Sequence, residues 1–249
     1  MLLLTVLLLF SAVLNQSLGQ EEEENEEDEE DLTKGSGVAL ELQQEIVDRH
    51  NEIRRNVEPT ASNMLKMIWN ETIGVSSRKW ADQCQPASSP MEDRTFDGVL
   101  CGQSIFQSNQ VVSWLEVINY WYGQRHVFKY GVGALDPLKS IYGYTQAVWY
   151  RSYQIGCAVS YCLLNEYSFH YVCQYCPTGN IAHQVATPYK EGPSCGDCPK
   201  NCEDKLCTNP CPYMDQAGHC DQLKKFVGCK TANKNGHCKA TCRCKNKIK

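Results

Sequence analysis

Cysteine is the residue type whose spacing most directly suggests chemistry in this chain. The 249 residues include 16 cysteines. Cys173-x2-Cys176 and Cys195-x2-Cys198 have the spacing of a zinc ribbon, in which four thiolates bind one Zn²⁺. An even number of cysteines in a secreted chain instead predicts disulfides. Because many further cysteines surround these four and the chain begins with an apolar segment, we favour disulfides over zinc.

The first residues have the pattern of a secretory signal peptide. Residues 2–14 form an almost continuous apolar run, followed by the small residues Ser17 and Gly19. This run is shorter than the roughly 20 residues that span a bilayer. We therefore predict a signal peptide at residues 1–19 and a secreted, extracellular protein without a transmembrane segment.

A strongly acidic segment follows, and it dominates the net charge of −5. Residues 21–31 contain eight Glu and two Asp, so the rest of the chain carries about five positive charges. Such a segment cannot bury a core, and we predict a disordered acidic leader at residues 20–37. It acts either as a solubilising leader or as a tail that shields a basic surface or weakly binds cations.

Helices and strands alternate in the middle of the chain. Apolar residues recur at helical spacing in residues 40–57, 71–84 and 113–121, and runs typical of strands occupy residues 99–106, 157–162 and 169–175. In the last run Phe169, Tyr171, Cys173 and Tyr175 alternate, which predicts a strand with one buried face. This order predicts a layered α/β domain that ends between residues 177 and 194.

Two polar residues in these elements have two interpretations each, and a third, Ser113, has one. His50 lies on the apolar face of the first helix and is expected to be a hydrogen-bonded core residue rather than a ligand. Asn70 precedes the second helix as a possible cap, and Asn70-Glu71-Thr72 is also the only glycosylation sequon outside the signal peptide. A glycan would occupy the side-chain amide that caps. Ser113 is expected to cap the third helix.

The last 55 residues hold ten cysteines and a basic surface. Cys195, Cys198, Cys202 and Cys207 form a first cluster, and a second begins at Cys211. The second cluster carries nine Lys or Arg against two Asp. A small, rigid, basic unit of this kind suits anionic partners such as channel vestibules, acidic receptors or polyanionic glycans.

The chain resembles the cysteine-rich secretory proteins of the CAP superfamily over residues 42–249. The residues that carry this resemblance are Ile46-Val47-Asp48-Arg49-His50-Asn51 with Arg54-Arg55, Tyr144-Thr145-Gln146-Ala147-Val148-Trp149, residues 170–181, Tyr189 and the spacing of the last ten cysteines. The acidic leader and Met64-Leu65-Lys66-Met67 are similar to mammalian epididymal members.

This resemblance implies an α/β fold, an α-β-α sandwich followed by a disulfide-rich hinge and a small helical cysteine-rich domain. The implied boundaries are residues 38–190 for the CAP domain, 191–209 for the hinge and 210–249 for the toxin-like terminal domain. The implied disulfides are Cys84–Cys162, Cys101–Cys176, Cys157–Cys173, Cys195–Cys202, Cys198–Cys207, Cys211–Cys244, Cys220–Cys238 and Cys229–Cys242.

The resemblance also locates a cleft where family members usually present two His and two Glu to a divalent metal. Here those positions are Ser88, Gln103, Gln124 and Gly143. Such an ion needs imidazole or carboxylate ligands, and acid–base catalysis needs a titratable group. We therefore expect no metal, no cofactor and no enzymatic activity at this cleft. His126 is a weak substitute, because a lone imidazole leaves most of the coordination shell unfilled.

Two non-enzymatic functions remain. The first is binding to a protein or glycan on sperm or egg surfaces, which in epididymal members is assigned to the segment matching residues 170–181. Within it Pro177, Thr178, Gly179, Asn180 and Ile181 are candidates for contact if they are exposed, although a purely structural role is favoured, because alternating aromatics in a disulfide-linked strand need no partner to explain them. The second is ion-channel modulation by the terminal domain.

For channel modulation the candidate contact residues are Lys224, Lys225 and Phe226, cations beside an aromatic ring. The alternative is a solvated basic face, which is the ordinary state of a Lys run. An enzyme with a Ser or Cys nucleophile is the weakest hypothesis. The thiols are expected to be oxidised, and no His lies near a Ser in a recognisable catalytic arrangement. No nucleic-acid partner is expected.

Overall fold

A computed structural model describes residues 35–249, and the predicted signal peptide and most of the acidic leader lie outside this range. The buried main-chain amide of Ser36 donates a 2.6 Å hydrogen bond to Glu71 Oε1. Because this amide has a carboxylate partner, residues 35–37 belong to the folded unit. The expectation that disorder extends to residue 37 is therefore wrong for these three residues.

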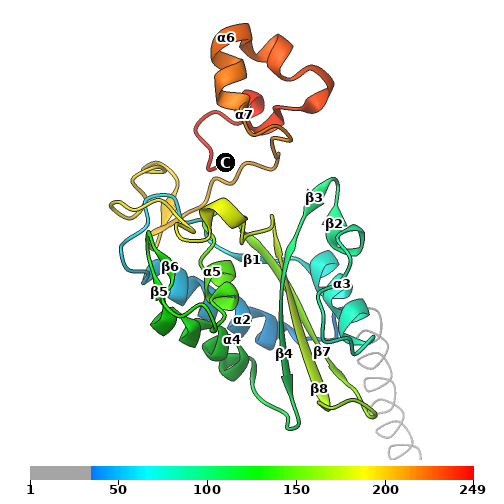
Figure 1. The fold of residues 1–249 in the computed structure, drawn as a ribbon. Coiled ribbons are helices and arrows are strands. Elements are labelled where there is room, and N and C mark those ends of the chain that lie inside the picture. The colour runs from blue at the N-terminus through cyan, green and yellow to red at the C-terminus, as the bar shows by residue number, and fades with distance from the viewer. Residues whose placement is uncertain (1–34) are drawn as a thin grey trace, which may run out of the picture.

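The large domain is a three-layer α-β-α sandwich (Figure 1). Its central sheet has the strand order β1-β7-β8-β4, with bounds β1 Ile68–Trp69, β7 Gln154–Tyr161, β8 Phe169–Cys176 and β4 Gly102–Ser108. Only the β1–β7 pair is parallel. The helices are α2 Leu40–Arg55, α3 Glu71–Ala81, α4 Trp114–Gly123 and α5 Tyr142–Ala147.

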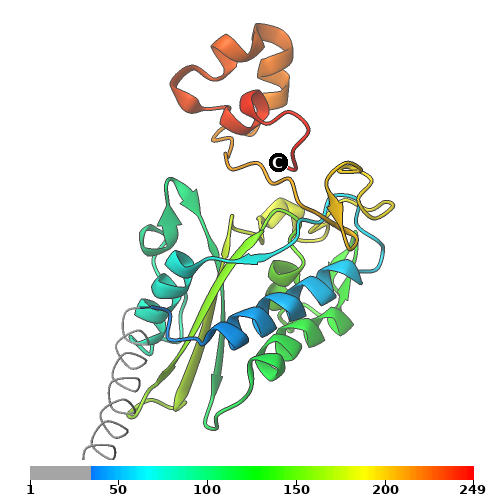
Figure 2. The same cartoon turned by 180° about the vertical axis from the view of Figure 1, so that it is seen from behind.

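Helices cover both faces of the sheet. Helix α3 packs on β7 and β8 from one side, and α2, α4 and α5 form the layer on the other side (Figure 2). Strand β8 is consequently buried on both faces, since His170, Val172 and Gln174 are as inaccessible as Tyr171 and Cys173. The prediction of a single buried face was wrong, because alternation of bulky side chains does not reveal a second covering layer.

The predicted helix caps are present. Asn70 Oδ1 accepts a 3.3 Å hydrogen bond from the amide of Ile73 at the start of α3. Because the cap uses the oxygen, the amide nitrogen, which is the atom that a glycan modifies, takes no part in it. Ser113 and Glu116 form a reciprocal capping box at α4.

Two buried basic residues of α2, His50 and Arg54, face the core. The ring of His50 contacts Ile46 O at 2.8 Å and Tyr175 Oη at 3.1 Å, and burial lowers the pKa of His50 to about 4. Arg54 donates to the main-chain oxygens of Leu65, Ala147, Trp149 and Tyr150. Burial lowers the pKa of Arg54 to about 9. His50 is thus a satisfied core residue, and Arg54 binds separate chain segments together.

The remaining elements are short. In the large domain they are η1 Glu92–Arg94, β2 Thr95–Phe96, β3 Val99–Leu100, η2 Gln124–Val127, β5 Phe128–Lys129, β6 Gly133–Ala134 and η3 Ala182–Gln184. The hinge contains β9 Cys202–Glu203 and β10 Leu206–Cys207. The terminal domain contains α6 Cys220–Ala232, η4 Lys234–Gly236 and α7 Lys239–Arg243.

Eight disulfides link all 16 cysteines, and they are the eight pairs that the family resemblance implies. The hinge is also tied to the large domain by the ion pairs Arg55–Asp204 and Lys66–Glu203. Within residues 35–249, no helix is both long and apolar enough to cross a membrane.

Candidate functional site

Of the four cleft positions, Gln124 and Gly143 are joined by a hydrogen bond, whereas Gln103 bonds to a residue outside the set. Gln124 Oε1 on η2 accepts from the amide of Gly143 at 2.8 Å and from that of Tyr144 at 3.3 Å. Gln103 Oε1 on β4 accepts from the amide of Ser89 at 2.8 Å. The side-chain partner of Gln103 is therefore Ser89, whereas the expected Ser88 is exposed. The side-chain oxygens of Gln103 and Gln124 are the strongest potential metal ligands at these positions, and both already accept hydrogen bonds from main-chain amides.

Gly143 is packed so closely that a side chain does not fit. A Cβ atom built on Gly143 would lie 2.7 Å from Trp121 Cδ1 and 3.0 Å from both Cβ and Cγ of Trp121. Trp121 is itself buried, at 2% exposure. An imidazole at this position would require the indole to move.

A divalent metal does not fit this set of residues. The donors are one exposed hydroxyl and two amide oxygens that already accept main-chain hydrogen bonds, and Gly143 supplies none. None of these groups is the imidazole or carboxylate that a zinc site uses. His126 is exposed on η2 and is the only imidazole among residues 121–130.

The cysteines with zinc-ribbon spacing are all oxidised. Cys173 and Cys176 bond to Cys157 and Cys101. Cys195 and Cys198 bond to Cys202 and Cys207. The sulfurs of Cys195, Cys198 and Cys207 lie within 4.8 Å of one another only because two disulfides pack together.

One Ser, His and Asp set lies on the sheet, but its order does not suit catalysis. Ser160 on β7 is opposite His170 on β8. Ser160 donates directly to Asp82, whereas His170 Nδ1 contacts Gln107 Nε2 at 3.3 Å. A nucleophilic serine needs the imidazole between itself and the carboxylate. This set is therefore a structural network.

Residues 177–181 use most of their polar groups internally. Thr178 N donates to Leu100 O at 2.7 Å, and Gly179 N donates to Gln146 Oε1 at 3.1 Å. Asn180 bonds to Thr145 and Tyr142. Pro177 and Gly179 are buried, and Thr178, Asn180 and Ile181 are half-buried. The structure thus does not provide the exposed surface that the proposed contact role of this segment requires.

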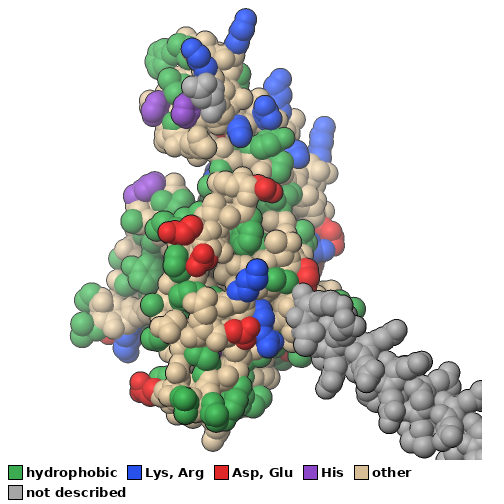
Figure 3. Space-filling model, turned by 90° about the vertical axis from the view of Figure 1, so that its right-hand side faces the viewer, with side chains coloured by type: hydrophobic (Ala, Val, Ile, Leu, Met, Phe, Trp, Pro, Cys, Tyr) green, Lys and Arg blue, Asp and Glu red, His purple; other side chains and the backbone are tan. Residues whose placement is uncertain are grey.

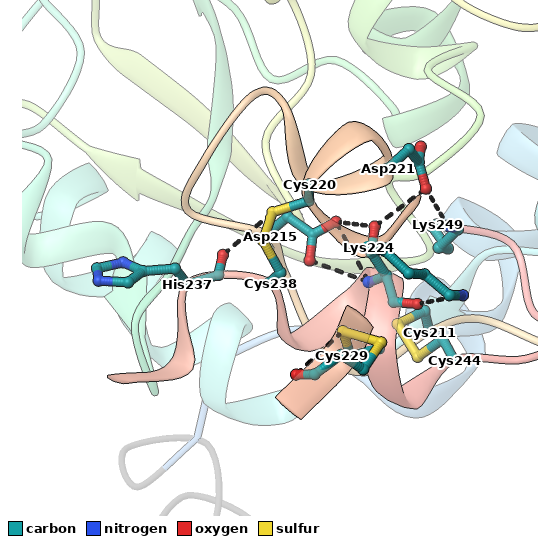
Figure 4. A network of polar contacts seen from close by, with 12 residues as sticks. Cys211, Asp215, Cys220, Asp221, Lys224, Cys229, His237, Cys238, Cys244 and Lys249 are labelled. Atoms are coloured by element: carbon teal, nitrogen blue, oxygen red, sulfur yellow. Dashed lines mark hydrogen bonds and ion pairs between the residues drawn. A yellow bond between two sulfur atoms is a disulfide. The ribbon is translucent and has the colours of Figure 1, made fainter. Parts of the chain in front are cut away.

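A polar network in the terminal domain joins Thr241 to Asp215 and Lys224, and Figure 4 shows these two partners. Asp215 accepts hydrogen bonds from the amide of Thr241 at 3.0 Å and from its hydroxyl at 2.6 Å. Lys224 Nζ donates to Thr241 O at 3.1 Å, and Lys249 Nζ pairs with Asp221 at 3.3 Å. Both acidic side chains of the domain are therefore engaged, and Lys224 is oriented by the domain itself.

Lys224, Lys225 and Phe226 are all exposed, but only Lys224 is held by a hydrogen bond within the domain. Phe226 is 85% exposed and Val227 is 47% exposed. Within residues 35–249, Lys225 has no ion pair or side-chain hydrogen bond. Gly228 interrupts α6 with φ 70° and ψ 167°, a conformation that favours glycine. Figure 3 shows Lys and Arg side chains projecting from one side of this domain.

Sequence reasoning did not anticipate a cavity of about 290 Å³ between the large and terminal domains. Asn70, Phe96 and Asp97 line one side, and Pro212 and Met214 line the other. Asp97 belongs to the hairpin turn Asp97-Gly98, whose φ angles are 50° and 75°. An Asp-Gly turn signal was present in the sequence, but nothing local indicated what the hairpin faces.

Comparisons with known proteins define the class. The sequence model of the cysteine-rich secretory protein family, CAP, matches residues 47–175, and the model named Crisp matches residues 195–249. The chain therefore belongs to the cysteine-rich secretory protein family. It has the CAP domain followed by the Crisp-type cysteine-rich region.

Solved structures support the same fold. Na-ASP-1 is 27% identical with a TM-score of 0.57, and the match covers 67% of this chain and 47% of that one, so this chain spans about half its length. NaASP2 with Zn²⁺ is 25% identical with a TM-score of 0.55, covering 69% and 97%. The hookworm platelet inhibitor is 22% identical with a TM-score of 0.53, covering 70% and 93%.

Proposed function

We propose that this protein is a secreted, non-enzymatic interaction protein that binds a protein or glycan on the surface of sperm or egg. Eight disulfides suit an oxidising, extracellular compartment. The acidic leader and the context of Met64 and Met67, which are similar to mammalian epididymal members, support the reproductive setting.

The observation that carries this proposal is the exposed Lys225–Phe226 pair on a disulfide-held domain. A large aromatic side chain at 85% exposure is a binding anchor, since burying it against a partner removes apolar area from water. Three disulfides fix its position, so little conformational entropy is lost on binding. Residues 177–181 are less suited to this role because they are largely engaged within the fold.

The large-domain cleft contributes no chemistry in this proposal. Its four positions are neutral, and two are committed to main-chain hydrogen bonds. Titration of the protein with Zn²⁺ by calorimetry is expected to show no tight 1:1 site. Tight binding that disappears in His126→Ala would contradict the loss of the metal site.

Cell binding tests the partner assignment. Fluorescently labelled full-length protein should bind sperm or egg surfaces saturably, and Phe226→Ala should weaken this binding at least about tenfold, as expected for loss of an aromatic anchor. Lys234→Gln is the matched control, because Lys234 is another exposed cation of the same domain. Equal binding by wild type and Phe226→Ala would contradict the assigned contact.

Regulation of an ion channel is a second candidate, favoured by the same cation beside an exposed aromatic ring. A channel vestibule lined by carboxylates would accept Lys225 while Phe226 packs on its rim. Patch-clamp recordings with the full chain distinguish the two functions. Current block that is lost in Lys225→Gln, without saturable cell-surface binding, would favour the channel.

A further inference from the structure

A further cavity, within the large domain, is lined chiefly by aromatic rings. It has a volume of about 290 Å³ and lies between the segment that follows α2 and the elements α4, η2, β5 and α5. Its aromatic walls are Tyr122, Phe128, Tyr130 and Tyr144. None of the four cleft positions lines this cavity, so its residues form a separate set.

The rings of this cavity are inclined to one another and held in place. The ring of Tyr144 makes an angle of 60° with that of Phe128 and of 49° with that of Tyr122, with centroids 5.3 and 6.2 Å apart. Tyr130 Oη donates a 2.7 Å hydrogen bond to Tyr189 O, which fixes the fourth ring. Inclined rings around one space can present several electron-rich faces to the same ligand, as in the aromatic cages that bind cations.

Two cations of the chain already contact one of these rings. The guanidinium carbon of Arg125 lies 4.0 Å from the centroid of the Tyr122 ring, and that of Arg49 lies 5.5 Å from it. Both distances are within the range of a cation–π interaction. The aromatic wall of the cavity therefore attracts positive charge.

Two opposite charges also line the cavity, and they are not paired. Glu58 and Arg125 both belong to its lining. Among residues 35–249, neither forms an ion pair with the other or with any further charged group. Burial raises the pKa of Tyr144 to about 12, and Arg125 and Glu58 shift this pKa in opposite directions, so both charges act near the Tyr144 hydroxyl. A ligand that carries both a cation and an anion would satisfy both side chains.

A quaternary ammonium joined to a phosphate has this chemistry. A quaternary ammonium has no N–H group, so aromatic faces and one carboxylate are sufficient to replace its weakly held water. A primary ammonium is strongly hydrated and needs hydrogen-bond acceptors that ring faces do not supply. A guanidinium binds phosphate through parallel N–H donors. The volume is at the small end of ligand pockets, which suits a single small headgroup.

We propose that this cavity binds a phosphocholine group. The trimethylammonium lies against Phe128, Tyr130 and Tyr144 beside the carboxylate of Glu58, and the phosphate contacts Arg125. This site goes beyond the contact assigned to Phe226 and does not depend on it, because it lies on the large domain.

Calorimetric titration of the full-length protein with phosphocholine tests the proposal. We expect saturable binding, which Phe128→Leu should weaken about tenfold, because leucine keeps an apolar side chain but offers no aromatic face. Phe106→Leu is the matched control, since Phe106 is another half-buried aromatic residue and does not line the cavity. Circular dichroism establishes that both variants are folded.

Ligand analogues separate the two halves of the site. The uncharged analogue of phosphocholine in which carbon replaces the nitrogen should bind about tenfold more weakly than phosphocholine, since it has the shape without the positive charge. Wild type should prefer phosphocholine to choline, and Arg125→Gln should abolish this preference.

Flotation with phosphatidylcholine vesicles identifies the source of the group. Co-flotation that free phosphocholine competes away assigns a lipid headgroup, and its absence assigns the soluble compound. No saturable binding of phosphocholine overturns the proposal. So do equal losses in Phe128→Leu and Phe106→Leu, equal binding of the uncharged analogue, or equal binding of choline and phosphocholine to wild type.

Discussion

The large domain buries a continuous core of bulky apolar side chains, whereas the terminal domain buries mainly cysteines. Ile46, Met67, Ile118, Trp121 and Tyr175 all lie below 3% exposure in the large domain. The buried clusters of the terminal domain consist of Cys211, Ala240 and Cys244, and of Cys220, Ala232 and Cys238. Apolar burial therefore accounts for most of the stability of the first domain, and covalent links account for most of that of the second.

This difference explains why the two domains present different surfaces. A domain with an apolar core must bury its aromatic residues, and most aromatics of the large domain are indeed packed together. A domain held by three disulfides does not need Phe226 in its interior. Phe226 can therefore remain at the surface, where it is available to a partner, without loss of folding stability.

The largest effect is expected from the longest disulfide loop. Replacing both Cys84 and Cys162 by Ala opens a loop with a sequence separation of 78 and should lower the free energy of unfolding by about 4 kcal/mol. The large domain should nevertheless remain folded, because its core is intact. Urea unfolding followed by tryptophan fluorescence measures the change, and a chain unfolded without denaturant would contradict the comparison.

A smaller change should be sufficient to unfold the terminal domain. Replacing Cys220 and Cys238 by Ala removes a link with a sequence separation of 18, which is worth about 3 kcal/mol. With no apolar core to compensate, residues 211–249 should lose hydrogen-exchange protection while the large domain keeps its own. Retained protection in α6 would show that the terminal domain has a second source of stability.

Acid should destabilise the large domain selectively. His50 has a folded pKa of about 4, below its usual 6.5, so the unfolded chain takes up a proton that the folded chain does not as pH falls through this window. Stability is full above pH 6.5 and declines toward pH 4, by about 2 kcal/mol between pH 8 and pH 5. Burial lowers the pKa of His170 in the same direction.

Thermal unfolding at several pH values measures this slope. His50→Gln should flatten it, and His126→Ala, which alters an exposed imidazole, should leave it unchanged. An equal slope in wild type and His50→Gln would assign the acid sensitivity to other groups.

The smallest effect is expected at a helix end. Ser113→Ala removes the capping box of α4 and should lower the free energy of unfolding by about 1 kcal/mol. Ser113→Thr keeps the hydroxyl and should lose little. Chemical unfolding of the two variants side by side makes the comparison, and equal losses would show that the hydroxyl is not the stabilising group.

Much of the fold could be predicted from the sequence because local signals were strong. The caps Asn70 and Ser113, and the three main strands, follow from residue type and period. The family resemblance supplied the layer order and the cysteine pairing, which spacing alone leaves open. The burial of Pro177 and Gly179 depends on Leu100 and Gln146, which are distant in sequence, so no local pattern announced it.

For the same reason, the identities of the candidate-site residues were predicted, but their contacts were not. The neutral residues of the cleft could be read from aligned motifs, but their hydrogen-bond partners, Ser89 among them, arise from tertiary contacts. Phe226 was named as a candidate contact residue because it adjoins two cations, although an aromatic residue in an amphipathic helix normally faces inward. The disulfides and the Gly228 kink change that expectation.

The close approach of Trp121 to Gly143 bears on how this cleft can change in evolution. Any side chain at residue 143 collides with the indole, so introducing an imidazole there requires a compensating substitution at residue 121. Each of the two changes made alone is unfavourable, the first because of the clash and the second because it leaves a void. No single substitution therefore places an imidazole at residue 143 without a cost in stability.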